Sequence, residues 1–322
     1  MQMFMECFAA QTRKTMFSCP SSQALDETRI SKRVVDNKPT LGDLLTACPE
    51  FVLQWDPLGP ATTNPSPPAG QNPGPDGDLF LGEVSEVTFL TSWAKLQELR
   101  RLVATRGTCR GSPSETDCFT ALIWAHATMA RMRVRSPGDG IRFSPGTEAR
   151  LLAPVNWRGH AFNHETRNFF GNTTAYPVTR VPLKEVVDAA EDMDLLAHLA
   201  SSISAMAEAV DEDFVATQTA LMRACPDIRH LGTNICLENP TGFSVDSWRS
   251  IGEGLSWGIS GILTSKADVV RPVHATNGDG TALILPTTDL SDYHVSVTLQ
   301  PQAMEVLCNN PGWRQWFHGV IR

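Results

Sequence analysis

Residues 114–131 read SETDCFTALIWAHATMAR, and this stretch says most about the fold. Ser114 is of a residue type that caps helix N-termini, and Asp117 stands three residues on, where a capping box places an acidic side chain. Four apolar side chains follow at helical spacing: Phe119, Leu122, Ile123 and Met129. The pattern predicts a capped amphipathic helix with one face on a hydrophobic core.

Strand and helix patterns alternate on both sides of this stretch. Residues 84–90 predict a strand, and Thr91 or Ser92 caps a helix that runs to about Arg106. Residues 182–224 predict the longest helical region, as two helices broken near residues 211–213. The other predicted elements are strands at 149–155, 169–176, 230–237, 267–273, 281–286 and 293–299, a turn at 277–280 and a short helix at 302–307. Together they predict an α+β fold in which helices lie beside a mixed sheet.

The N-terminal part differs in composition from the rest. Residues 3–13 have helical apolar spacing with no capping residue ahead of them, which suggests that a further segment precedes them. Residues 56–78 are so rich in Pro, Gly and Asn that they predict a surface loop or linker. We therefore expect a boundary at this loop, with residues 1–78 and 79–322 as two units.

Charge and hydropathy exclude several classes of partner. The 322 residues carry a formal net charge of −8, whereas a nucleic-acid partner needs a basic surface. No run of about eighteen apolar residues is present, so no membrane-spanning helix is expected. A signal peptide has its positive charges before the apolar run, whereas here they follow the first apolar run. We therefore expect a cytoplasmic protein. The eight cysteines form no C-x-x-C pair and are expected to be free thiols.

Metal ligation is not expected. His160 and His164 have a spacing that would suit a metal on a helix, but Pro154 and Gly159 favour a loop there, and no third ligand is evident. Asp211-Glu212-Asp213 has no second acidic cluster to complete a magnesium site and reads as a solvated turn between helices.

Several motifs occur in an order that is known from one protein family. They are S-E-T-D-C-F-T-A-L-I-W at 114–124, V-N-W-R at 155–158, N-F-F-G-N at 168–172, S-W-R at 247–249, L-S-W-G at 255–258, D-V-V-R-P at 268–272 and V-S-V-T-L at 295–299. Their order and spacing resemble those of the BAHD acyltransferases, and particularly the fungal branch that includes the trichothecene acetyltransferases.

The resemblance implies a chloramphenicol-acetyltransferase-like fold of two similar domains with a channel between them. Residues 1–78 would be a remnant of the N-terminal domain plus a loop, and residues 79–322 mainly the C-terminal domain. The family uses acyl-coenzyme A as a cosubstrate, with no bound cofactor. Ser114, Asp117, Arg158 and Thr173 match positions that approach coenzyme A or support that approach, although Ser114 also reads simply as a helix cap and Arg158 as an ion-pair residue.

Two departures from the family pattern concern catalysis and one loop. The family's general base is the histidine of an H-x-x-x-D motif, and none of the eight histidines here has an aspartate four residues later. The simplest interpretation is that the chain begins just after that motif, so no catalytic residue is assigned. Ser256, Trp257 and Gly258 stand at the family's structural D-W-G, and Ser256 cannot form the charge-assisted pair of an aspartate.

Two functions follow as expectations. The first is a monomeric O-acyltransferase of fungal secondary metabolism, of the kind found in mycotoxin pathways, which moves an acyl group, expected to be acetyl, from acyl-coenzyme A to a hydroxyl of a small acceptor. The second is a catalytically inactive or truncated relative that acts as a binding protein.

Overall fold

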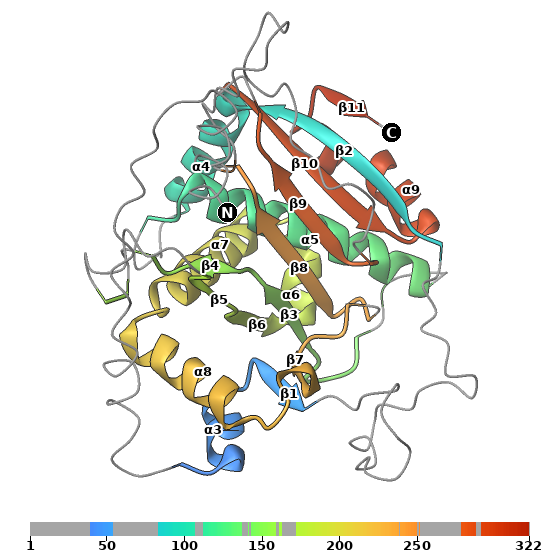
Figure 1. The fold of residues 1–322 in the computed structure, drawn as a ribbon. Coiled ribbons are helices and arrows are strands. Elements are labelled where there is room, and N and C mark those ends of the chain that lie inside the picture. The colour runs from blue at the N-terminus through green and yellow to red at the C-terminus, as the bar shows by residue number, and fades with distance from the viewer. Residues whose placement is uncertain are drawn as a thin grey trace, which may run out of the picture.

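A seven-stranded mixed sheet lies at the centre of the computed structural model (Figure 1). The structure describes residues 39–53, 83–106, 112–136, 141, 143–158, 161–162, 172–237, 239–249, 251, 278–287 and 291–321. In spatial order the strands are β11 (Gly319–Ile321), β2 (Ser85–Ser92), β10 (Asp292–Leu299), β9 (Thr281–Leu285), β8 (Gly242–Ser247), β3 (Glu148–Leu152) and β6 (Val178–Pro182). Strand β8 is parallel to β9 and to β3, and all other neighbours are antiparallel. The predicted α+β class with a mixed sheet is confirmed.

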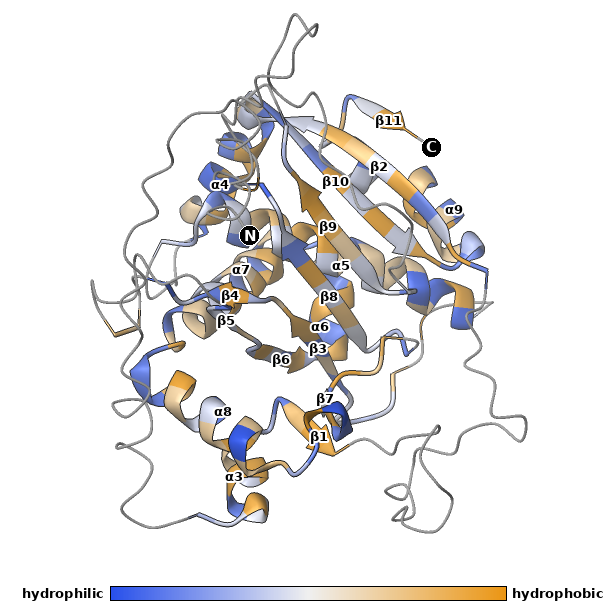
Figure 2. Ribbon diagram, viewed as in Figure 1, coloured by the Kyte–Doolittle hydropathy of each residue, from blue (hydrophilic) through white to orange (hydrophobic). Residues whose placement is uncertain are grey.

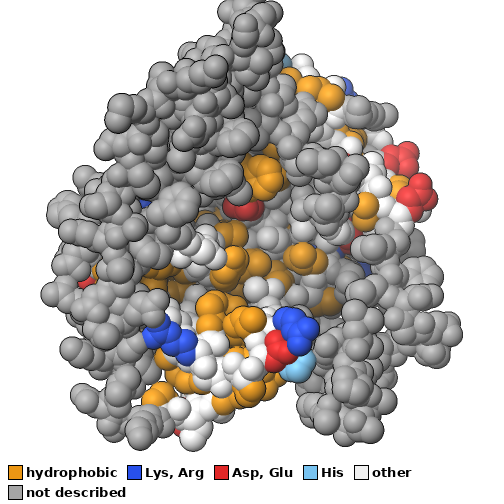
Figure 3. Space-filling view, in the orientation of Figure 1, with side chains coloured by type: hydrophobic (Ala, Val, Ile, Leu, Met, Phe, Trp, Pro, Cys, Tyr) orange, Lys and Arg blue, Asp and Glu red, His pale blue; other side chains and the backbone are white. Residues whose placement is uncertain are grey.

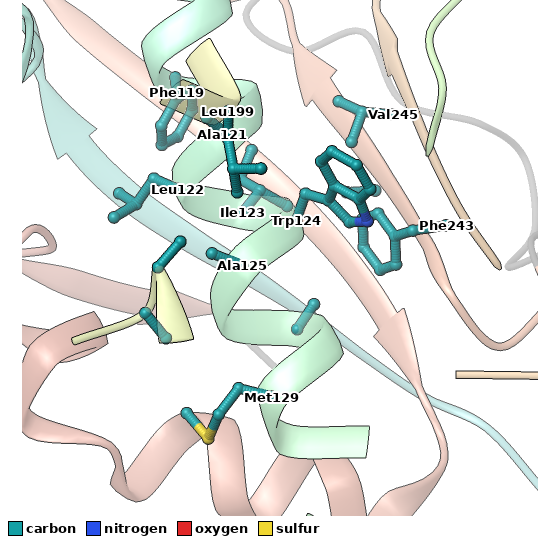
Figure 4. Close-up of a cluster of buried hydrophobic side chains, with 14 of the residues drawn as sticks. Phe119, Ala121, Leu122, Ile123, Trp124, Ala125, Met129, Leu199, Phe243 and Val245 are labelled. Atoms are coloured by element: carbon teal, nitrogen blue, oxygen red, sulfur yellow. The ribbon is translucent and has the colours of Figure 1, made fainter. Parts of the chain in front are cut away.

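Helix α5 (Glu115–Arg135) is the centre of the helical layer on one face of this sheet (Figure 1). It contacts α4 (Trp93–Thr105), α6 (Leu183–Asp188), α7 (Met193–Glu208), α9 (Pro301–Asn309) and strand β8. Every residue of 118–132 is buried, because helices surround α5 on the sides that the sheet leaves open. In Figure 4, Trp124 extends from α5 toward Phe243 and Val245 of β8.

Side-chain alternation separates the two faces of the sheet. In β8, Phe243 and Val245 belong to the core cluster that includes α5. Ser244 and Asp246 must therefore lie on the opposite face, because successive strand residues point to opposite sides. Figure 2 shows the same mixture of apolar and polar residues along the central strands. The sheet thus has one apolar face under the helices and a second face that carries polar groups.

A smaller packing unit, which we call the small lobe, joins two distant parts of the sequence. It consists of α3 (Leu41–Ala47), β1 (Phe51–Leu53), α8 (Glu212–Ala224) and β7 (Leu231–Thr233). Strands β1 and β7 pair antiparallel, and α3 packs on α8. Asn234 donates hydrogen bonds from its backbone N to the carbonyl of Glu50 and from its side chain to the carbonyl of Pro49. Residues 39–53 are thereby fixed to a region about 180 positions later in the chain.

The helical region and the strands around it differ in part from the predictions. Residues 182–224 form three helices rather than two: the break at Asp211 was predicted, but a second one follows α6, where Asp192 caps α7. The strand expected at 149–155 is divided into β3 and β4 (Val155–Asn156) around Pro154, which has no N–H for a ladder bond. The strand expected at 230–237 is reduced to β7 after a 3₁₀ turn at Ile228–His230.

Several strands were not predicted, and some predictions lie outside the described residues. The sequence signals missed β1, β6, β8 and β11. The turn expected at 277–280 leads into β9, and Gly280 has a φ of 82° there. The expectations for residues 1–38, 56–78, 169–171 and 267–273 and for Ser256, Trp257 and Gly258 concern residues that the structure does not describe. Within the described part of the chain, no helix is long and apolar enough to cross a membrane.

Candidate functional site

The N-terminus of α5 is closed by a complete capping box. The Ser114 Oγ accepts a hydrogen bond from the Asp117 N at 3.1 Å, and the Asp117 carboxylate accepts one from the Ser114 N at 2.8 Å. The Ser114 hydroxyl also donates to the same carboxylate oxygen at 2.8 Å. The cap predicted from the sequence is confirmed, and the two predicted site residues lie together.

Arg158 and Thr173 also lie together, through a residue that sequence analysis did not select. The Thr173 hydroxyl donates to the Asn156 Oδ1 at 2.8 Å, and the Arg158 backbone N donates to the same oxygen at 3.1 Å. The Trp157 N in turn donates to the Thr173 carbonyl at 2.9 Å. Asn156 thus joins the end of β4 to the start of β5 (Thr174–Ala175). In the sequence, Asn156 was marked only by its place inside the V-N-W-R motif at 155–158.

A pocket of about 110 Å³ lies between the helix layer and the carboxyl ends of the parallel strands β3 and β8. Its walls are Asp117 and Thr120 of α5, Thr179 of β6, Ile203 and Met206 of α7, and Asp246 of β8. The carboxyl ends of parallel strands are where open α/β sheets commonly hold ligands. The pocket therefore includes one predicted site residue, Asp117, and adjoins β4 at Val155.

Asp246 is the second acidic residue that borders this pocket, but its carboxylate is held on the face of the sheet away from α5. Its carboxylate accepts hydrogen bonds from the Trp248 Nε1 at 3.1 Å and from the Ser247 N at 2.7 Å. Arg249 continues the segment and stacks on the Tyr293 ring at 3.4 Å from the centroid. Figure 3 shows that this side of the molecule is hollowed in its middle, where apolar side chains gather around an acidic group.

Acidic groups also dominate the electrostatics at the start of α5. Burial disfavours the ionised form of Glu115, but hydrogen bonds from Gln97 and from Arg100 outweigh it, so that the pKa of Glu115 lies below its usual value. Glu115 is therefore ionised two positions before Asp117. No Lys or Arg of the described ranges lines the pocket.

Neither His126 nor His198 of the helical layer lines the pocket, and no metal centre is found among the described residues. His126 of α5 is the most buried histidine there, and burial, together with the charge of Arg133, lowers its pKa to about 4. His198 of α7 lies at the surface, 3.4 Å from a Glu185 carboxylate oxygen. No group of three or more His, Cys, Asp or Glu side chains in the described ranges could hold a metal ion. His160 and His164 lie outside those ranges.

The mixed sheet with its covering helices agrees with the outcome of the family comparison. A model of the "Transferase family" matches residues 82–312, which is most of the chain. The chain belongs to this family, and the resemblance to BAHD acyltransferases is confirmed. No curated protein sequence matches the chain.

Solved structures share the fold at low sequence identity. The TRI101 of F. sporotrichioides, complexed with coenzyme A and T-2, is 17% identical, with a TM-score of 0.57 over 73% of this chain and 51% of that one. The TRI101 of F. graminearum, complexed with coenzyme A and T-2 mycotoxin, is 14% identical, with a TM-score of 0.66 over 97% of this chain and 63% of that one. Vinorine synthase is 16% identical, with a TM-score of 0.50 over 73% of this chain and 48% of that one. The chain spans about half the length of most of these structures.

Proposed function

We propose that this protein takes part in acyl transfer from acyl-coenzyme A to a hydroxyl of a small acceptor molecule. Family membership over residues 82–312 carries the proposal, and the likeness to a fold that holds coenzyme A and T-2 in TRI101 supports it. Acyl-coenzyme A would be a cosubstrate, and no resident cofactor is proposed. Acetyl is the proposed acyl group, and a fungal secondary metabolite is the proposed acceptor, in a monomeric cytoplasmic protein.

Two pairs of residues are proposed to contact or support coenzyme A. Ser114 and Asp117 present hydroxyl and backbone groups at the start of α5, and Arg158 and Thr173 are joined through Asn156. Arg158 is the cation of this set, so we propose that its guanidinium meets a phosphate, which Arg binds in a bidentate manner. Ser256, Trp257 and Gly258 are proposed to shape the adjoining loop, as the family motif does.

The general base of this reaction is not assigned to a histidine of this sequence. No histidine has an aspartate four residues later, and His126 is buried, with its Nδ1 out of contact with solvent. This observation favours a second candidate function, in which the chain binds coenzyme A or an acceptor without catalysis. We also propose the boundary at residue 78 as the division between a partial N-terminal domain and the C-terminal domain.

Calorimetric titration of the purified chain with coenzyme A tests the proposal first. We expect binding, and Arg158→Met should weaken it by about tenfold, because a charge-assisted hydrogen bond is lost. Arg133→Met is the matched control, because Arg133 is a surface arginine that pairs with Glu191. It should leave the affinity unchanged.

Thiol release from acetyl-coenzyme A in the presence of candidate alcohols then separates the two functions. The chain's own cysteines, such as the exposed Cys236, require a blank without acetyl-coenzyme A. Binding with acceptor-dependent thiol release supports the acyltransferase. Binding without release supports the binding protein. Absence of coenzyme A binding would overturn the acyltransferase, and absence of binding by both coenzyme A and the candidate alcohols would overturn the binding protein as well.

A further inference from the structure

Strand β11 lies at the edge of the sheet beside β2 (Figure 1), and it borders a groove of about 660 Å³. The walls of this edge groove come from β2, the end of α9, the short helix α10 (Pro311–Arg314) and the turn into β11. Clefts of about 300–1,000 Å³ are of the size that holds small molecules. Ser114, Asp117, Arg158 and Thr173 have no part in its lining. The edge groove is therefore a place for a small molecule other than the one proposed for coenzyme A.

Three aromatic rings in mutual contact form the floor of the edge groove. Phe317 packs on the Trp313 ring at 4.3 Å and on the Phe89 ring at 5.3 Å between centroids. Trp313 and Phe89 meet edge to face at 5.1 Å. These two rings are almost fully buried, whereas Phe317 is only partly buried. Phe317 is thus a ring held in place by two others, and its remaining surface is available to a further aromatic group.

Val320 of β11 adds an exposed apolar side chain to this floor. It stands opposite Phe89 in the pairing of β11 with β2, so both side chains lie on the same face of the sheet. Val320 lines the edge groove and is 50% exposed. A flat ligand that covers Phe317 and Val320 removes apolar surface of both residues from water, which favours binding.

The charged side chains at the edge groove are basic. Arg314 and His318 line it, and no Asp or Glu of the described ranges does, not even Glu305 of the neighbouring α9. The Arg314 guanidinium is exposed and has no ion-pair or hydrogen-bond partner within the described part of the chain. The carbonyl end of α9 contributes a partial negative charge of about one half, which the full charge of Arg314 exceeds. The groove therefore favours an anion, and a guanidinium suits a planar carboxylate.

We propose that the edge groove binds a small planar aromatic carboxylate. The carboxylate pairs with the Arg314 guanidinium, and the ring lies against Phe317 and Val320. Arginine holds a carboxylate through two parallel hydrogen bonds, and ring-to-ring contact adds to the effect of the buried area. The assignment does not rest on the proposed function, because it uses none of the residues proposed for coenzyme A.

Three probes with the same ring system test the assignment: naphthoate, naphthamide and naphthylmethylammonium. Saturation-transfer NMR titrations on the whole chain give their dissociation constants at pH 7 and low salt. We expect naphthoate to bind most tightly and naphthamide about tenfold more weakly, because the charge-assisted pair with Arg314 is lost. The ammonium should bind more weakly still. An amide or ammonium that binds as tightly as naphthoate would overturn the proposal, as would the absence of naphthoate binding.

Variants locate the binding in the edge groove. Arg314→Gln should weaken naphthoate binding about tenfold and leave naphthamide binding unchanged, because only the charged pair is removed. Arg101→Gln is the matched control, since Arg101 is an exposed arginine of α4 that lines no part of the groove. It should leave both affinities unchanged. Val320→Glu places a like charge in the groove and should weaken naphthoate binding more than naphthamide binding.

Thermal melts show that each variant is folded, which is expected because Arg314, Arg101 and Val320 are exposed. Native naphthoate affinity in folded Arg314→Gln would sink the assignment. Competition with coenzyme A keeps the two sites apart. Naphthoate binding that persists at saturating coenzyme A supports a separate site, whereas full displacement would overturn it. Absence of coenzyme A binding by the native chain contradicts only the proposed function.

Discussion

Gly280 occupies a position where the fold requires a residue without a Cβ. Its φ of 82° lies in the left-handed region, which residues with a Cβ rarely adopt. A Cβ at this position would come within 2.8 Å of both the Leu237 carbonyl oxygen and the Arg131 Nη1. The close approach brings the turn before β9 against α5. The sequence alone marked this position as a turn, but not as a contact with Arg131.

Gly280→Ala should lower the free energy of unfolding by about 2–3 kcal/mol, because a left-handed conformation and a steric contact are both imposed on alanine. Gly278→Ala is the matched control: a Cβ at Gly278 would have no heavy atom within 4 Å, and its φ is not left-handed. Urea denaturation followed by circular dichroism measures both. Equal losses in the two variants would contradict the role given to Gly280.

Thr128 is a position where the side-chain hydroxyl is expected to lower the stability of the fold. The residue is 0% exposed, and its Oγ1 has no hydrogen-bond partner. Thr128→Val should raise the free energy of unfolding by about 1 kcal/mol, because an unsatisfied buried hydroxyl is replaced by a methyl of the same shape. Thr219→Val should give no such gain, since its hydroxyl donates to the Val215 carbonyl at 2.7 Å. Thermal melts of the two variants decide the comparison.

Single residues also show which parts of the candidate site could be predicted. Ser114 and Asp117 were predicted as a cap, because a capping box involves groups only three positions apart. Asn156 was missed because its partner Thr173 is brought to it by the pairing of β4 with β5, and Asp246 was missed because its place beside the pocket depends on the position of β8 in the sheet. Thr120 was identified only as part of the helix motif at 114–124. Its place in a pocket could not be predicted, because the pocket also depends on β6 and β8.

At the scale of elements, helix α5 buries a histidine in the core, where the protonated imidazole is disfavoured. His126 is 2% exposed, its Nδ1 has no hydrogen-bond partner, and it packs against the Trp313 ring at 5.6 Å between centroids. Burial first, and then the charge of Arg133, lower its pKa to about 4. The folded protein therefore holds His126 neutral where the unfolded chain would protonate it.

This difference predicts a pH dependence of stability. The unfolded chain binds the extra proton below its pKa of about 6.5, so the His126 contribution is complete above that pH and is lost as pH falls toward 4. At pH 5 the loss should be about 2 kcal/mol relative to pH 7. His126→Phe should flatten the slope between pH 7 and pH 5 in urea titrations. Parallel slopes for the native chain and the variant would contradict the buried neutral state.

Elements were predictable where one periodic pattern dominated. Helix α4 and strands β2, β9 and β10 lie within a few residues of their predicted positions, because their apolar spacing reflects a single buried face. Strand β8 was missed because only two large apolar residues, Phe243 and Val245, mark its buried face, although it lies at the centre of the sheet. The break between α6 and α7 was missed because residues 189–192 continue a helical composition.

At the scale of the whole molecule, one buried ion pair joins the helical layer to the sheet. Arg131 of α5 contacts Asp279 at 2.8 Å, with side chains 3% and 9% exposed. Its guanidinium also donates to the Gly242 carbonyl at 2.6 Å and to that of Leu237, while Asp279 accepts from the Gln300 N at the start of α9. The pair thus connects α5, β8, β9 and α9.

Arg131→Met should cost about 3–5 kcal/mol of unfolding free energy, because Asp279 would stay buried without its cation. Arg133→Met, two positions on, should cost less than about 1 kcal/mol, because its pair with Glu191 is exposed. Denaturant unfolding of both variants measures the contrast. Similar losses would show that the buried pair contributes no more than a surface one.

The small lobe has a consequence for local opening. Phe51 pairs with Thr233, which is far away in sequence, so docking of residues 39–53 closes a long loop for the contacts of one short segment. Such a unit opens at a lower free energy than the α5 core. Cys48 lies inside it, and burial, aided by the charge of Glu50, raises the pKa of its thiol to about 12.

Cys48 is therefore a built-in reporter of that opening. While the lobe is closed, the thiol of Cys48 is protonated and covered, and it cannot react, because it is the thiolate that attacks an alkylating reagent. Mass spectrometry of iodoacetamide-treated protein in mild urea should find Cys48 labelled well before Cys118, which is buried in α5. Equal labelling rates would mean that lobe and core unfold as one unit. The ordering would let the docking of residues 39–53 be followed without any engineered label.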